Sequence, residues 1–258
     1  MERTRPESAV RSHRAGRALL VVVAGAGISW SLAAVDGLSE FYQLDRISES
    51  ILSGEMVPPR SLGPLLARFD SSLSVGCERN MIPRAVIRLY AAVSARDSAA
   101  SDASLLLNSA ERQLKETLVC TPYQPYLWYG LFWVRMMQGE RPQNYIPLLE
   151  QSYALGPREL WISIYRNSDA LPLFSQLDVR TRALVRAEYL NLAKEQTDVA
   201  ARNFKSSDDS TRSYLLKWIS DLSIEQRRNF AAALDRTDVV ANVPGVEYRE
   251  GHVVWGRK

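Results

Sequence analysis

The chain has 258 residues, of which 46% are hydrophobic and 24% charged, as is usual for a folded globular protein. Residues 1–17 contain five Arg and two Glu and carry the whole formal net charge of +3, so the rest of the chain is neutral overall and no nucleic-acid partner is expected. Two Cys and two His exclude a disulfide-dense mini-domain, a zinc ribbon and a His-rich metal cage, and we expect neither a metal nor a cofactor.

The first element is an uncharged stretch of 18 residues, 18–35, bounded by Arg17 and Asp36. As a helix it would be about 27 Å long, close to the ~30 Å hydrocarbon core of a bilayer. Because arginines precede this stretch, the positive-inside rule places the N-terminus in the cytoplasm. The sequence therefore predicts a cytoplasmic basic leader at 1–17, a transmembrane anchor at 18–35 and an exported domain at 36–258.

Two details of this stretch leave alternatives open. Ser31-Leu32-Ala33 resembles the cleavage site of a secretory signal, and a cleaved signal would export the domain without a tether. Gly25, Ser29 and Ala33 form a stripe of small residues along which another membrane helix can approach closely. The alternative is that this stripe faces lipid.

Export changes the interpretation of Cys77 and Cys120. Disulfides form in oxidising compartments, and an even number of Cys favours pairing there. A Cys77–Cys120 bridge would close a loop of 43 residues, for which chain-entropy models give roughly 4 kcal/mol. The sequence predicts this disulfide, with two buried free thiols as the alternative.

Apolar residues at helical spacing predict an all-α exported domain of antiparallel helix pairs. Pro58, Pro59 and Pro64 are expected to interrupt the helical pattern after the first helix. The predicted helices cover 41–51, 82–93, 107–118, 126–137, 142–155, 158–166, 179–195, 197–205, 211–222 and 224–235.

Capping residues mark several boundaries of these helices. Asp178, Thr197 and Asp209 are the expected N-caps, and Ser223-x-x-Gln226 predicts a capping box. Strand signals occur only near the C-terminus, where segments 246–249 and 252–255 predict a small β-hairpin.

Pro122 and Pro157 are 35 residues apart, close to the 34-residue period of tetratricopeptide repeats. Trp128, Leu131 and Gly139 stand where that repeat has its Trp, its Leu and its inter-helix turn. Other positions depart from the pattern, and the similarity covers about 55 residues. The chain thus resembles a tetratricopeptide-like stack of helix pairs.

A second similarity involves several segments: Leu118–Trp128, Gln151–Pro157, Trp161, Tyr165–Asn167 and Val243–Val246. In these segments the chain resembles a group of bacterial single-pass, periplasm-facing helical proteins associated with exopolysaccharide or cell-envelope polysaccharide production. The resemblance covers about residues 77–246 and carries no catalytic residue. It implies a bacterial inner-membrane location with the bulk in the periplasm, and envelope or inner-membrane proteins as partners, or polysaccharide.

Sequence signatures of enzymes are sparse. His13 lies in the leader and His252 near the C-terminus, so a catalytic triad would depend on His252 alone. The chain has no Walker A loop, no His-Glu-x-x-His and no Cys-x-x-Cys. We therefore expect a noncatalytic adaptor. A carbohydrate-binding or carbohydrate-processing domain is the alternative, because a glycosidase needs only two carboxylates and leaves no motif.

The candidate binding residues come from two places. Residues 123–133 contain six of the 23 aromatic side chains, and helix packing is the first interpretation of this cluster. Tyr126, Tyr129 and Trp133 are its members most expected to reach a ligand or partner surface. Arg166 and Asn167 are the other candidates, because they lie beside two aromatic residues that could line a groove.

Overall fold

A computed structural model describes the backbone of residues 7–71 and 76–247, and the side chains of 20–32, 41–70 and 76–247. The described residues form helices and contain no strand, which confirms the all-α prediction. The elements are α1 (Glu7–Leu52), α2 (Pro59–Ser71), α3 (Met81–Asp97), α4 (Ala103–Cys120), α5 (Pro125–Met137), α6 (Pro142–Leu155), α7 (Leu160–Ala170), the 3-10 helix η1 (Leu171–Gln176), α8 (Val179–Glu195), α9 (Thr197–Ser206), α10 (Asp209–Ile219) and α11 (Ile224–Arg236).

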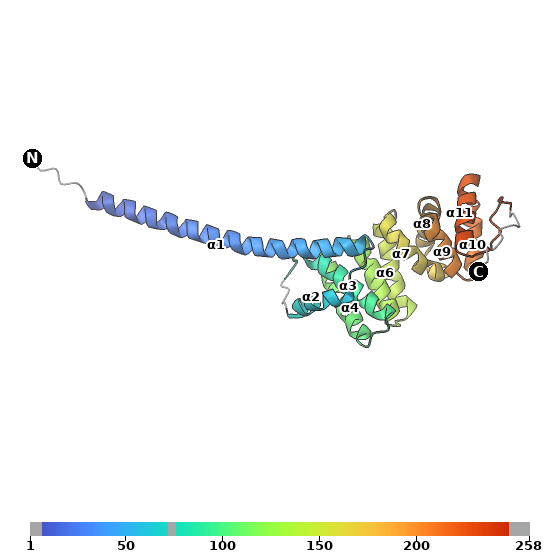
Figure 1. The fold of residues 1–258 in the computed structure, drawn as a ribbon, viewed down its shortest axis with the longest axis horizontal. Coiled ribbons are helices and arrows are strands. Elements are labelled where there is room, and N and C mark those ends of the chain that lie inside the picture. Colours follow the sequence, from blue (N-terminus) through green and yellow to red (C-terminus); the bar gives the residue numbers. More distant parts are fainter. Residues whose placement is uncertain (1–6, 72–75, 248–258) are drawn as a thin grey trace, which may run out of the picture.

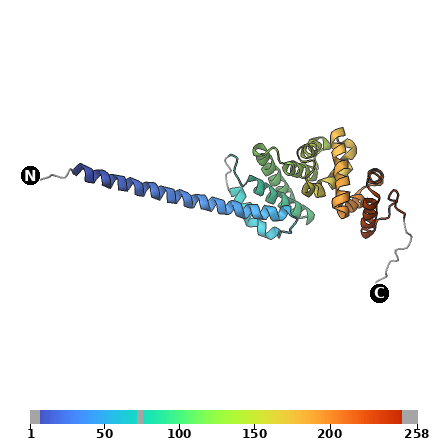
Figure 2. The same cartoon turned by 90° about the horizontal axis from the view of Figure 1, so that it is seen from above.

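Helix α1 is a single rod that projects far beyond the other helices, which together form an elongated body (Figures 1 and 2). Only its C-terminal part is docked, where Leu44 is buried with Leu62 of α2 and Ile87 of α3. The Tyr90 hydroxyl donates to the Val57 carbonyl at 3.0 Å and accepts from the Val57 N–H at 3.1 Å, which holds the connection between α1 and α2.

The predicted anchor, 18–35, lies within α1, and the side chains at both of its ends fall outside the described residues. In the part of the chain that the structure describes, no helix is both long enough and apolar enough to cross a membrane.

The body is built by packing each helix mainly against those nearest to it in the chain. Helices α3, α4 and α5 share one core, which includes Leu89, Leu114 and Leu131. Helices α5 to α11 share a second and larger core, so α5 contributes to both. Short connections join consecutive helices, and such connections favour antiparallel neighbours.

Two glycines allow close helix contacts in this arrangement. A Cβ added at Gly130 of α5 would stand 2.8 Å from a Leu89 methyl group of α3, so a larger residue here would have to displace the Leu89 side chain. A Cβ added at Gly156 would stand 2.6 Å from the Pro125 ring, which brings the end of α6 onto the start of α5.

Most predicted boundaries agree with the structure to within a few residues, and two helices were missed. The prolines at 58, 59 and 64 were expected to interrupt the helical pattern, but Pro59 begins α2 and Pro64 lies inside it. Helix α2 forms because its apolar residues Leu62 and Phe69 are buried against α1 and α3. The 3-10 helix η1 was also not predicted.

The predicted caps are partly right. Asp178 accepts from the Thr181 N–H at 2.6 Å, and the Ser223–Gln226 capping box is present in both directions. Thr197 and Asp209 are wrong by one residue, because each is the first helical residue after the cap. The predicted hairpin lies largely outside the described residues, which end at 247.

The predicted disulfide is present in the structure. The sulfur atoms of Cys77 and Cys120 are 2.07 Å apart, and the Cα atoms are 5.6 Å apart. The bridge joins the segment before α3 to the last residue of α4. It therefore closes the end of the α3–α4 helix pair that lies opposite their connecting turn.

We expect the disulfide to stabilise the folded chain. Replacing both Cys77 and Cys120 by Ser should lower the free energy of unfolding by about 2–4 kcal/mol, because the unfolded chain regains the freedom of the closed loop. A reductant should destabilise the wild type to a similar extent and leave the double variant unchanged. Alkylation of both thiols in denatured, unreduced protein would contradict the bridge.

Candidate functional site

The aromatic cluster of α5 lies mainly in the core. Phe132 is fully buried, and its ring is 5.7 Å from that of Tyr145 on α6. Tyr129 is also buried, so its prediction as a surface residue is wrong. Tyr126 is half-buried against the Trp161 ring at 5.2 Å, and Trp133 is half-buried between the two cores. Helix packing, the first interpretation, describes this cluster better than a binding surface does.

Arg166 and Asn167 do not line a groove. Both are completely buried, so their prediction as a ligand or partner surface is wrong. The buried positions of α7 are Ile162, Ser163, Arg166, Asn167 and Ala170, which fall on one helical face. These two polar residues therefore point into the core together with the apolar ones.

A network of polar contacts surrounds the buried Arg166. Its Nη1 donates to the Ser152 carbonyl and hydroxyl, both at 3.0 Å, and its Nη2 donates to the Gly156 carbonyl at 3.0 Å and forms an ion pair with Glu188. The guanidinium also stacks over the Tyr153 ring, 3.9 Å from its centroid. Arg166 of α7 thus holds the C-terminal carbonyls of α6 and a carboxylate of α8.

The carboxylate of Glu188 has partners on both oxygens. The Tyr153 hydroxyl donates to Oε1 at 2.6 Å, while the Ser163 hydroxyl donates to Oε2 at 2.7 Å alongside Arg166. Burial raises the pKa of Tyr153 well above 10, and the nearby Glu188 adds to this effect, so the phenol stays protonated. This network joins three helices. Because it is shielded from solvent and its charges are paired, it offers no group to a substrate.

A second carboxylate, that of Asp169, is partly buried beside α5. The Tyr129 hydroxyl donates to Asp169 Oδ2 at 2.8 Å. Burial raises the pKa of Asp169, and the hydrogen bond from Tyr129 opposes this shift only in part. The pKa of Tyr129 is raised well above 10 by burial and by the neighbouring Asp169.

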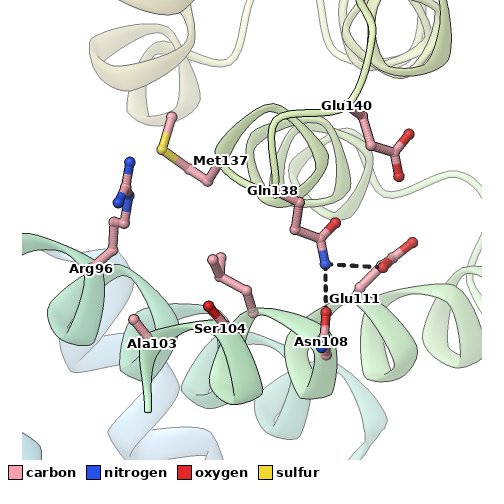
Figure 3. Close-up of a pocket in the computed structure, with 9 residues that line it drawn as sticks. Arg96, Ala103, Ser104, Asn108, Glu111, Met137, Gln138 and Glu140 are labelled. Atoms are coloured by element: carbon pink, nitrogen blue, oxygen red, sulfur yellow. Dashed lines mark hydrogen bonds between the residues drawn. The ribbon is translucent and has the colours of Figure 1, made fainter. Parts of the chain in front are cut away.

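A polar pocket of about 470 Å³ lies where the C-terminal ends of α3 and α5 meet the start of α4 (Figure 3). The lining residues are Arg96, Ala103, Ser104, Leu107, Asn108, Glu111, Met137, Gln138 and Glu140. In Figure 3, Arg96 stands on one side of the hollow, while Asn108, Glu111 and Gln138 stand on the other. This volume is within the range of small-molecule sites.

One wall of the pocket is fixed by hydrogen bonds. Gln138 Nε2 donates to Asn108 Oδ1 at 2.9 Å and to Glu111 Oε2 at 3.2 Å. Lys115 and Arg135 approach the other oxygen of Glu111 at 2.5 and 3.3 Å. Burial raises the pKa of Glu111, but the hydrogen bonds from Lys115 and Gln138 and the positive charges outweigh it, so the net pKa is lowered and the carboxylate is ionised.

No pattern in the sequence points to this pocket. Its residues lie on α3, α4, the end of α5 and the turn that follows α5, between positions 96 and 140, and contain no motif. Asn108 and Glu111 are polar residues on a helix whose opposite face is apolar. This pattern predicts that they lie at the surface, but it does not predict a pocket.

The described part of α1 presents a different surface. Its large apolar side chains between positions 20 and 32 are 60–79% exposed, and no described element packs on them. Of the predicted small-residue stripe, Gly25 has nothing within 4 Å of an added Cβ, Ser29 donates to the Gly25 carbonyl at 2.9 Å, and the side chain of Ala33 is outside the described residues.

Comparison of the chain with protein-family models, with curated proteins and with solved structures finds no match. Among the residues described, no group of three His, Cys, Asp or Glu side chains is placed to hold a metal ion. The pocket and the exposed stretch of α1 are therefore the features from which function can be argued.

We expect the buried ion pair to be essential for stability. Arg166→Met should lower the free energy of unfolding by about 3–5 kcal/mol, because Glu188 would remain buried without its counter-charge. The double variant Arg166→Met/Glu188→Leu should lose less, since it leaves no unpaired charge. Urea unfolding measures both.

The exposed Arg186–Asp221 ion pair supplies a matched control, because both side chains are about half exposed. Arg186→Met should cost at most about 1 kcal/mol. Equal losses for Arg166→Met and Arg186→Met would show that the buried pair has no special role.

The partial burial of Asp169 predicts a pH-dependent stability. Because its pKa is raised in the folded state, its contribution is fully favourable below the unfolded value of about 3.8 and is lost as pH rises through the folded pKa. Asp169→Asn should therefore raise Tm at pH 7 and change it less at pH 3.5, as measured by thermal unfolding. The exposed Asp97→Asn is the control, and a destabilised Asp169→Asn at pH 7 would contradict the expectation.

Proposed function

We propose that the chain is a noncatalytic scaffold, tethered to a bacterial inner membrane through residues 18–35, whose periplasmic helical body binds protein partners. The observation that carries this proposal is the apolar and unpartnered stretch of α1. Large apolar side chains there, Trp30 among them, are exposed along a rod that projects from the body (Figure 1). A lipid bilayer would cover this surface at a low energetic cost.

The disulfide supports a location outside the cytoplasm. The Cys77–Cys120 bridge uses both cysteines of the chain, and such bridges persist in oxidising compartments. The five arginines of the leader support a cytoplasmic N-terminus. Together they favour a periplasmic body over a cytoplasmic one.

The architecture of the body supports a scaffold. Its helices pack mainly on chain neighbours, which gives an elongated stack with a large surface for its size, and we propose that this stack is tetratricopeptide-like (Figure 2). Its buried polar groups Arg166 and Glu188 join helices. Envelope polysaccharide machinery as the source of the partners rests on the sequence resemblance of residues 77–246.

Two reporter fusions after Lys258 test the tether and its orientation. A reporter active only outside the cytoplasm should work, and a cytoplasm-only reporter should not. The fusion protein should remain in the membrane fraction after a high-salt wash, because an apolar helix in lipid does not depend on ion pairs. A cytoplasmic reporter signal, or release of the full-length chain by salt, would contradict the proposal.

Crosslinking in native membranes tests the scaffold itself. Photo-crosslinkable residues at exposed positions of the body should join the chain to other envelope proteins, whereas the same residue at buried Leu114 should not. Deleting residues 36–258 should impair polysaccharide output, and alanine at any single exposed Asp or Glu should leave output nearly intact. Loss of output after one such carboxylate change, in a folded and membrane-bound protein, would favour a carbohydrate-processing enzyme instead.

A further inference from the structure

We infer that the end of the α3–α4 pair closed by the disulfide rests on the periplasmic surface of the bilayer, with Val119 and Tyr123 in the lipid headgroup layer. The inference rests on the proposed tether through residues 18–35 and adds a second contact with the membrane. It follows from the short distance along α1 between tether and body, from the elements at that end of the body, and from the side chains exposed there.

The body begins close to the proposed membrane segment. Phe41 is the first described side chain of α1 that is partly buried, and Leu44 is completely buried. At about 1.5 Å per residue, the helix rises about 9 Å from Val35 to Phe41. The headgroup layer on each side of a bilayer is about 5–8 Å thick. An edge of the body at the level of Phe41 therefore lies against this layer.

The end of the body nearest the free part of α1 is formed by the end of α2 and the segment that leads into α3 (Figures 1 and 2). Cys77 lies in that segment, and its Cα atom is 5.6 Å from that of Cys120. The disulfide therefore brings the last turn of α4, and residues 121–124 after it, to the same end. Farther along α3, Tyr90 binds Val57 beyond the opposite end of α1, so α3 leads away from the bilayer.

Two large apolar side chains are exposed at this end of the body. Val119 is 84% exposed and Tyr123 is 82% exposed. Tyrosine suits the membrane interface, because its ring is apolar and its hydroxyl hydrogen-bonds to headgroups or water. Tyr42, which follows Phe41 on α1, is also exposed. The headgroup layer would cover these side chains at the level where α1 enters the body.

The turn that carries Tyr123 is held in place by the fold. The Trp128 indole N–H donates to the Pro122 carbonyl at 2.8 Å, and the Thr121 hydroxyl donates to the Thr117 carbonyl at 2.8 Å. The disulfide fixes the residue before this turn. Insertion of Tyr123 into the headgroup layer therefore costs little conformational entropy of the backbone.

The charges at this end suit a phospholipid surface. Arg79 is exposed and forms no ion pair with a described residue, so its guanidinium can pair with a lipid phosphate. The carboxylate of Glu78 is opposed by Arg84 at 3.8 Å. The exposed Glu116 lies one helical turn before Cys120, back along α4. The phosphate-binding group is therefore beside the disulfide, and the exposed carboxylate is set back from it.

Fluorescence quenching of the full-length chain in nanodiscs tests this inference. The discs contain phosphatidylethanolamine and phosphatidylglycerol, with spin-labelled lipids as quenchers. A dye is attached through a noncanonical amino acid at one position at a time, which leaves the disulfide intact. A dye at Tyr123 should be quenched by lipids that carry the spin label in the headgroup. A dye at Val179, an exposed residue at the start of α8, should not be quenched.

A dye at Trp30 separates the inference from the tether on which it rests. Quenching at Trp30 by lipids labelled in the acyl chain measures the tether alone. Quenching at Trp30 without quenching at Tyr123 would overturn the inference and leave the tether in place. No quenching at Trp30 would overturn both. If a photo-crosslinker at Tyr123 joins the chain to proteins and the dye there is not quenched, this end docks a protein and the inference is wrong.

A double substitution tests the two exposed side chains. Val119→Glu/Tyr123→Glu should reduce the headgroup quenching of a dye at Gln124 by about half or more, because carboxylates enter the interface less readily than apolar groups. The control Val179→Glu/Tyr214→Glu changes two exposed residues on α8 and α10, at the far end of the body, and should leave this quenching unchanged (Figure 1). Circular dichroism verifies that each variant is folded. Equal quenching in the two double variants would overturn the inference.

Discussion

A guanidinium group cannot be buried without partners that neutralise and hydrogen-bond it, and this constraint organises the centre of the body. Arg166 is among the largest fully buried side chains of the described chain. It donates to the carbonyls of Ser152 and Gly156 at the end of α6, while Glu188 supplies the counter-charge from α8. Three helices can therefore meet in only one register, and the apolar residues around them pack within it.

The sequence predicts helix ends well where a residue imposes them locally. Pro125 and Pro142 each occupy the first turn of a helix, and Ser223 caps α11 by a contact three residues away. Helix α2 was missed because a proline inside a helix usually breaks it. The burial of Leu62 and Phe69 against distant segments outweighs that cost, and such burial cannot be deduced from the local sequence.

Less of the candidate site than of the helix ends could be predicted, again because the burial of a residue depends on segments that are distant in the sequence. Arg166 and Asn167 carry polar groups and stand beside exposed aromatic rings, which favoured a groove. The burial of Arg166 depends on Glu188, which is 22 residues away, and that of Asn167 on the Val185 carbonyl and on Asn203. These partners reach α7 because α8 and α9 pack against it. The pocket wall at Gln138 likewise depends on Asn108, 30 residues earlier. Contacts of this range are set by tertiary packing.

The continuity of α1 has a consequence for orientation. The helix runs without a break from the proposed membrane segment to Leu44, which is fixed in the core of the body. No flexible linker separates the two, and the helix turns by about 100° for every residue. The direction in which the body faces around the membrane normal is therefore set by the number of residues between anchor and core. One residue added there would turn every surface of the body away by more than a right angle, whereas seven would return it nearly to its original bearing about 10 Å farther from the bilayer.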